Sequence, residues 1–191
     1  IWTTECPMET NKRVHACSAV VFSVVVLVVI SDTECKLLLD GGVAVDTIKV
    51  KTTNAGNIVG RTVTLDDGKT KIHEFHNIRY AKAPVGTLRF RPPVRNIEED
   101  PEKEVPASDS TPIKCIQVDS GDGVEDCLVL TVRTGDLTAS ARPVIVWIHG
   151  GGFSEGYGSQ QGNSFDSEVT HKVDAVTVNI NYRLGFLGFS S

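Results

Sequence analysis

Apolar and polar residues alternate along much of the chain in the pattern expected of β-strands. Residues 47–52 (TIKVKT) alternate as in a strand with one buried face. Residues 63–65 and 71–75 are two further strand-like runs, and between them residues 66–68 (DDG) supply turn-forming side chains and a glycine. This arrangement predicts a β-hairpin.

The middle of the chain has weaker patterns. Residues 80–93 (YAKAPVGTLRFRPP) are rich in proline, which removes backbone donors, so we expect an irregular, extended segment. Residues 96–111 are acidic and polar without a clear period, which predicts a surface connection. Residues 128–133 (LVLTVR) are a strand candidate.

Two later segments have a different pattern. Residues 144–148 (VIVWI) and 175–180 (AVTVNI) are nearly unbroken apolar runs rich in β-branched residues. Such runs are typical of strands buried on both faces in a sheet covered by helices. A short helix is expected between them, over residues 164–173. The pattern therefore predicts an α/β fold in which an antiparallel hairpin leads into a mostly parallel central sheet.

The N-terminal stretch has the layout of a secretory signal peptide. Met8 is the only methionine, Lys12 and Arg13 form a short basic region, residues 16–30 are apolar or small, and cleavage is expected near Ser31. The apolar run is shorter than the roughly 20 residues that a membrane-spanning helix needs. An uncleaved signal anchor, the one route to membrane attachment, is the alternative. The signal predicts a secreted, extracellular protein.

The chain is accordingly divided into residues 1–7, which are interpreted as sequence upstream of the true start, a signal peptide over residues 8–31, and one domain over residues 32–191. The 191 residues suffice for a sizeable core. A formal net charge of −5, without a basic run interleaved with aromatic residues, argues against a nucleic-acid partner. No zinc-type cysteine spacing occurs, and neither a metal nor a cofactor is expected.

The glycine triplet after the first buried strand is the strongest chemical signal. His149 is followed by Gly150, Gly151 and Gly152. Acyl transfer develops negative charge on a carbonyl oxygen, and backbone N–H groups directed at that oxygen stabilise it. Glycines permit positive φ and a close approach of substrate to the backbone. A buried strand that runs into HGGGF predicts an oxyanion hole.

Four ordered motifs resemble those of type B carboxylesterases, the serine esterases that include the cholinesterases. They are FHNIRYAKAPVGTLRFRPP (75–93), VEDCLVLTV (124–132), PVIVWIHGGGF (143–153) and VNINYRLGFLGF (178–189). The resemblance implies the N-terminal portion of an α/β-hydrolase fold and a carboxylic ester hydrolase that acts on small-molecule esters through an acyl-enzyme. It also implies that Gly151 and Gly152 supply the oxyanion N–H groups.

The resemblance also decides between two overlapping motifs. Residues 152–156 (GFSEG) fit the G-x-S-x-G pattern of a nucleophile elbow, with Ser154 at the centre. In the family this position is variable, and the nucleophile follows a later strand and opens a helix. Ser154 is therefore rejected as the nucleophile.

The same family pattern implies two structural pairs. Cys115 and Cys127 match its first disulfide, whose closure is expected to stabilise the fold by roughly 3 kcal/mol in an oxidising compartment. Arg89 and Glu125 match an internal salt bridge. Cys35 is left without an assigned partner.

The family order places the catalytic serine, acid and histidine beyond position 191. The 191-residue chain alone is therefore expected to be inactive. The alternative to an esterase is a non-catalytic relative that serves in adhesion or binding. Oligomeric state and acyl preference are left open by the sequence.

Overall fold

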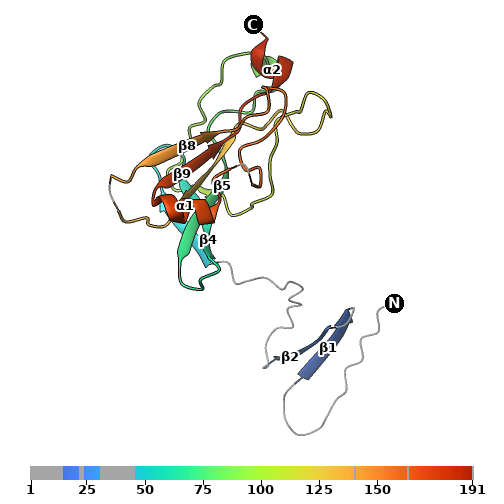
Figure 1. Ribbon diagram of the computed structural model, residues 1–191, viewed down its shortest axis with the longest axis vertical. Helices are drawn as coiled ribbons and strands as arrows, with labels where there is room; N and C mark the ends of the chain where they lie inside the picture. The colour runs from blue at the N-terminus through green and yellow to red at the C-terminus, as the bar shows by residue number, and fades with distance from the viewer. Residues whose placement is uncertain (1–14, 22–23, 31–45, 140, 163, 191) are drawn as a thin grey trace. The chain divides into compact units, whose positions relative to one another are not determined.

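A computed structural model describes residues 15–21, 24–30, 46–139, 141–162 and 164–190 (Figure 1). The chain divides into two units, Ile1–Val43 and Ala44–Ser191. The second unit contains all of the motifs that resemble an esterase.

The first unit contains an antiparallel pair of strands, β1 (His15–Val21) and β2 (Val24–Ile30). These strands cover the apolar centre of the expected signal peptide. Met8, Lys12 and Arg13, the cleavage position near Ser31, and Cys35 lie outside the described residues, so the signal peptide stays a prediction. None of the helices in the described ranges has the length and apolar character needed to cross a bilayer.

The second unit is built on a seven-stranded mixed sheet. Its main path runs β3 (Asp46–Lys51), β4 (Asn57–Thr64), β5 (Lys71–Arg79), β7 (Val129–Thr134), β9 (Val176–Ile180) and β8 (Val144–Ile148), while β6 (Glu104–Pro106) pairs with β4. The pairings from β3 to β9 are antiparallel. Strands β8 and β9 are parallel, with α1 (Ser167–Val173) between them in sequence. The antiparallel start and the later parallel pair agree with the sequence pattern.

The predicted hairpin is β4 and β5, and both strands are longer than the sequence pattern indicated. Its turn closes through a hydrogen bond from Leu65 N to Thr70 O at 2.9 Å. Gly68 has φ of +68°, a conformation that glycine adopts without strain. The position of the hairpin that the turn residues predicted is therefore confirmed.

Three short elements were missed or misplaced. β6 lies inside residues 96–111, which were expected to be only a surface connection; its three residues pair in parallel with β4. α2 (Gly185–Phe189) was not predicted. The 3-10 turn η1 (Gly86–Leu88) is the only element within the proline-rich segment of residues 80–93, which is otherwise irregular as expected.

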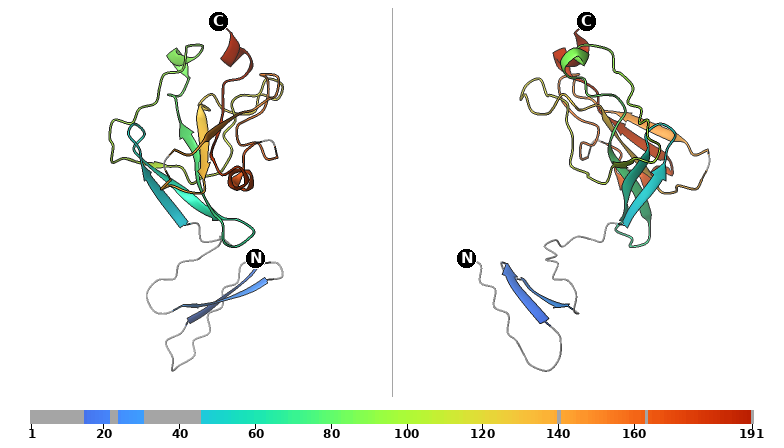
Figure 2. Two further views of the ribbon diagram at one scale, coloured as in Figure 1. Left: turned by 60° about the vertical axis from the view of Figure 1, so that its left-hand side comes forward. Right: turned by 180° about the vertical axis from the view of Figure 1, so that it is seen from behind.

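The helix between β8 and β9 begins later than the predicted residue 164. The carboxylate of Asp166 accepts a hydrogen bond from Val169 N at 2.8 Å and so caps the helix at its start. The helix packs against β5 and β7, where Ser167 and Thr170 are buried (Figures 1 and 2).

The prediction that residues 144–148 are buried on both faces is wrong for β8. Val144, Val146 and Ile148 are 60%, 53% and 63% exposed. β8 pairs only with β9, and within the described residues no helix packs on the face that carries these three side chains. β9 lies between β7 and β8 and alternates between buried and partly buried side chains, so burial depends on the place of each strand in the sheet.

Two apolar clusters form the core of the described unit. One surrounds the disulfide and contains Ala81, Cys115, Cys127, Leu128 and Leu184. The other is formed by Ile58 of β4, Phe75 of β5 and Ala107. Tyr182 packs against the disulfide cluster and stacks on His149 of the glycine-rich loop that follows β8, and so links the two.

Candidate active site

The segment from His149 to Gly156, here called the glycine loop, follows directly on β8. Gly151 and Gly152 have φ of +110° and +58°. A Cβ placed on Gly151 would lie 2.1 Å from the carbonyl oxygen of Glu155. Glycine is therefore required at position 151 both by backbone conformation and by space.

The glycine loop is closed by hydrogen bonds onto one carbonyl group. Gly151 O accepts from Ser154 N at 3.0 Å, from Glu155 N at 3.1 Å and from the Ser154 hydroxyl at 3.1 Å. These bonds fix the orientation of the peptide group that follows Gly151. They form a tight turn that uses the Gly151 carbonyl oxygen and the N–H groups of Ser154 and Glu155, but not the N–H groups of Gly151 and Gly152.

The N–H groups of Gly151 and Gly152 are left free in this arrangement. Neither donates a hydrogen bond to any other described residue, and both residues are exposed. Neither belongs to a strand or helix. The two predicted oxyanion donors are therefore available to a ligand.

A cavity of about 550 Å³ lies beside the loop, and Gly150 and Gly151 form part of its wall. Trp147 also lines it, and the buried indole N–H of this residue has no hydrogen-bond partner within the described ranges. Lys114 and Tyr157 line it as well, and the Lys114 ammonium lies 4.8 Å from the centre of the Tyr157 ring. The cavity wall therefore carries both polar and apolar groups.

His149 forms a buried base for the loop. The residue is 5% exposed, and its ring stacks on that of Tyr182 with centroids 4.3 Å apart. Its Nδ1 lies 2.8 Å from Gly150 O, and a carbonyl can only accept, so Nδ1 carries the hydrogen. Burial lowers the pKa of His149 below its usual 6.5, although the bond to Gly150 opposes this. We assign His149 a role in shaping the loop.

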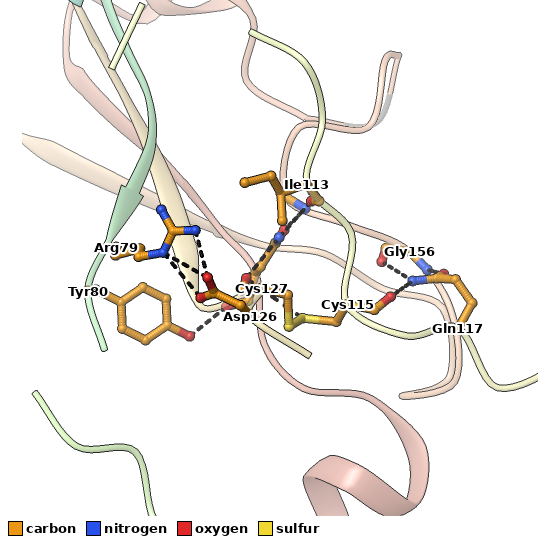
Figure 3. The surroundings of a disulfide bond; sticks show 10 residues. Arg79, Tyr80, Ile113, Cys115, Gln117, Asp126, Cys127 and Gly156 are labelled. Atoms are coloured by element: carbon orange, nitrogen blue, oxygen red, sulfur yellow. Dashed lines mark hydrogen bonds and ion pairs between the residues drawn. A yellow bond between two sulfur atoms is a disulfide. The ribbon is translucent and has the colours of Figure 1, made fainter. Parts of the chain in front are cut away.

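Other segments hold the loop from outside. Phe153 O accepts from Gly185 N at 2.7 Å, which joins the loop to the start of α2. Ser154 O accepts from Val118 N at 2.9 Å. Gly156 binds the side chain of Gln117, a contact that sequence reasoning missed (Figure 3).

Ser154 has the environment expected of a structural residue. Its hydroxyl donates to Gly151 O, and none of the hydrogen bonds in the described residues joins it to a histidine. Turns and irregular chain separate it from the next helix, α1. A nucleophile elbow needs a strand, a sharp turn at the serine and then a helix. The GFSEG match lacks this context.

The structure pairs Cys115 with Cys127, with their Cα atoms 4.9 Å apart (Figure 3). Arg89 and Glu125 form a two-pronged ion pair, with Nη2 2.5 Å from Oε1 and Nε 2.7 Å from Oε2. A second such pair joins Arg79 to Asp126, with Nη2 2.7 Å from Oδ2. Sequence reasoning did not predict this second pair.

A buried polar cluster around Glu74 was also missed by sequence reasoning. One carboxylate oxygen accepts from Arg133 Nε at 3.0 Å and from the Ser167 hydroxyl at 2.5 Å; the other lies 2.7 Å from Arg61 Nη2 and 2.8 Å from His76 Nε2. Burial disfavours the charged carboxylate, but hydrogen bonds from His76 and Ser167 and the charge of Arg133 hold the pKa of Glu74 well below its usual 4.5.

The Glu74 cluster contains serine, glutamate and histidine but cannot act as a catalytic triad. The Ser167 hydroxyl donates to the Glu74 carboxylate and not to His76, so the histidine is not placed to take the serine proton as it does in a catalytic triad. None of these side chains lines the cavity beside the glycine loop. Across the described part of the chain, no group of three or more His, Cys, Asp or Glu side chains is arranged to hold a metal ion.

The chain is similar to known proteins over most of its length. A family model described as "Carboxylesterase family" matches residues 46–191. The "Pyrethroid hydrolase Ces2e" of Rattus norvegicus is 37% identical over 161 residues, which cover 74% of this chain and 27% of that protein. The "Para-nitrobenzyl esterase" of Bacillus subtilis (strain 168) is 34% identical over 155 residues, covering 75% and 29%.

Solved structures give the same result. The Geobacillus stearothermophilus carboxylesterase EST55 aligns with a TM-score of 0.60 at 33% identity, covering 74% of this chain and 27% of that one. These matches confirm the expected α/β-hydrolase fold class. The chain spans between a quarter and a third of the length of the relatives it matches.

Proposed function

Because the chain belongs to the carboxylesterase family, we propose that the whole protein hydrolyses small carboxylic esters through an acyl-enzyme. In this reaction a serine oxygen attacks the ester carbonyl carbon, and the carbonyl oxygen takes on negative charge. The N–H groups of Gly151 and Gly152 bind that oxygen. The serine, acid and histidine come from parts of the whole protein that this chain does not contain.

The free N–H groups of Gly151 and Gly152 carry this proposal. The loop uses the Gly151 carbonyl internally and leaves two adjacent donors exposed, and Gly151 itself lines the cavity. Loss of one such donor in a serine hydrolase typically costs about 3–4 kcal/mol of transition-state stabilisation. A protein used only for adhesion has no need of these donors, which favours the enzyme over a non-catalytic relative.

A fluorophosphonate probe applied to the whole protein tests the proposal. Such probes phosphonylate an activated serine, so we expect one labelled serine, outside residues 1–191, together with hydrolysis of p-nitrophenyl acetate. Hydrolysis without labelling would contradict the acyl-enzyme. Absence of both from the folded protein would support the non-catalytic relative.

We also propose that the protein is secreted and that residues 8–31 are removed. The basic pair followed by an apolar run supports this, as does the Cys115–Cys127 disulfide, since disulfides persist in oxidising compartments. N-terminal sequencing of the protein recovered from culture medium is expected to give a start near residue 32. Retention in the membrane with Met8 intact would instead indicate a signal anchor.

A further inference from the structure

The side chain of Gln117 binds both backbone polar groups of Gly156, the last residue of the glycine loop. Gly156 N donates to Gln117 Oε1 at 2.6 Å, and Gln117 Nε2 donates to Gly156 O at 3.2 Å. The same Nε2 donates to Cys115 O at 2.6 Å. Figure 3 shows the carboxamide extended between the disulfide and Gly156. Both ends of this amide are therefore in use.

Gly156 lies directly against the start of the loop. Gly156 has φ of +102°, and a Cβ on it would lie 2.6 Å from His149 Nδ1 and 2.8 Å from Gly150 O. The two ends of the loop are thus in close contact. A displacement of Gly156 would release His149 and Gly150, and Gly150 is bonded directly to the first oxyanion donor.

Gln117 is itself fixed by its surroundings. It lies two residues after Cys115, whose disulfide to Cys127 belongs to the buried core. Its backbone N–H donates to Asp122 O at 2.7 Å, and its carbonyl accepts from Gly121 N at 3.0 Å. The carboxamide is therefore presented from a short, cross-linked segment, which is also joined to the glycine loop by the bond from Val118 N to Ser154 O.

In the described part of the chain, two side chains from other segments bind the backbone of the glycine loop. Tyr182 donates to His149 O at the start, and Gln117 binds Gly156 at the end. The loop contains no strand or helix that could hold its conformation. The two side chains fix its two ends.

We propose that Gln117 is a positioning residue for the oxyanion hole: it transmits the rigidity of the Cys115–Cys127 loop to Gly156 and so keeps the Gly151 and Gly152 N–H groups directed at the substrate oxygen. The catalytic part of this inference rests on the proposed esterase function. The Gln117 side chain is among those that line the cavity, but both ends of its amide are bonded to backbone groups and are therefore not free to bind the substrate. It acts through the backbone of the glycine loop.

The test compares Gln117→Leu and Gln117→Glu with a matched control, Gln161→Leu, in the whole protein. Leucine removes both hydrogen bonds to Gly156, whereas glutamate keeps an acceptor for Gly156 N–H and loses the donor. Gln161 is exposed and does not line the cavity. Hydrogen exchange of peptides covering residues 149–158 and the kinetics of p-nitrophenyl acetate hydrolysis are measured for each.

For Gln117→Leu we expect faster hydrogen exchange in residues 149–158. We also expect kcat to fall about 10- to 100-fold while KM changes less than about threefold, because oxyanion donors act in the transition state. Gln117→Glu should fall between Gln117→Leu and the wild type, and Gln161→Leu should match the wild type. This graded order distinguishes positioning from a general loss of stability.

Unchanged exchange in residues 149–158 of Gln117→Leu would overturn the proposal, as would an effect on KM alone. If Gln117→Leu does not fold, Gln117→Glu decides the question by the same two measurements. If the wild type hydrolyses no ester, the proposed function fails, but the exchange comparison still determines whether Gln117 holds the loop.

Discussion

The rings of Tyr182 and His149 stack with centroids 4.3 Å apart and planes 15° apart, while the Tyr182 hydroxyl donates to the carbonyl oxygen of His149 at 2.8 Å. One side chain thus covers the imidazole and satisfies the backbone at the start of the glycine loop. Tyr182 follows β9 by two residues, so this contact joins the ends of two parallel strands.

Tyr182→Phe should destabilise the whole protein by about 1 kcal/mol, because the buried His149 carbonyl loses its donor while the stack remains. Tyr182→Leu should cost about 1 kcal/mol more, since the stacking is lost as well. Urea unfolding measures both. Tyr157→Phe is the control, because the Tyr157 hydroxyl has no hydrogen-bond partner among the described residues; a cost equal to that of Tyr182→Phe would contradict the prediction.

The buried His149 should make stability depend on pH. Its pKa is lowered in the folded state, so the unfolded chain binds a proton more readily, and stability is full above about pH 6.5 and falls as the pH is lowered. We therefore expect the difference in unfolding free energy between the wild type and His149→Asn to shrink between pH 7.5 and 5.5. The corresponding difference for Gln161→Asn should stay constant, and a constant difference for His149→Asn would refute the prediction.

Glu74→Gln should cost roughly 3–5 kcal/mol, because it leaves the buried guanidinium of Arg133 without its counter-charge. Glu104→Gln, which breaks the exposed pair with Lys49, should cost less than about 1 kcal/mol. Chemical denaturation of both variants checks the contrast.

Since the pKa of Glu74 is held low, the contribution of Glu74 to the unfolding free energy is complete above about pH 4.5 and is lost as the pH falls below that value. Equal losses of unfolding free energy for Glu74→Gln and Glu104→Gln would contradict the prediction that the buried Glu74–Arg133 pair contributes more than the exposed one.

Ser154→Ala should keep ester hydrolysis within about threefold of the wild type, because only one hydrogen bond inside the loop is lost. Removal of a true nucleophile lowers kcat on the order of 10⁶-fold. Steady-state kinetics and fluorophosphonate labelling separate the two cases. A Ser154→Ala protein that no longer reacts with the probe would identify Ser154 as the nucleophile after all.

Gly151→Ala and Gly150→Ala should behave differently although they are adjacent. A Cβ at position 151 would clash with Glu155 O. Alanine would also have to adopt the positive φ of this position, which costs at least about 1–2 kcal/mol. A Cβ at 150 meets nothing within 4 Å, so its effect on stability should be within about 1 kcal/mol. Thermal unfolding measures the difference, and equal melting temperatures would contradict the assigned loop conformation.

Local signals in the sequence predicted the elements that depend on neighbouring residues. The DDG turn gave the hairpin of β4 and β5, and the β-branched runs gave β8 and β9. The missed strand β6 has only three residues and exists because it pairs with β4, more than 40 positions earlier. Three residues are too few to show the alternation of apolar and polar side chains by which a strand is predicted.

By itself the sequence determined the family and the fold class through its ordered motifs, and it located the glycine loop and the hairpin turn because glycines and turn residues act through local backbone geometry. The tertiary structure alone decided which groups meet: Gln117 with Gly156, Tyr182 with His149, and Glu74 with Arg133. It also showed that, within the described residues, one face of β8 is exposed, since burial depends on the place of a strand in the sheet. These contacts join residues 33 to 59 positions apart, and only the folded chain brings them within hydrogen-bond distance.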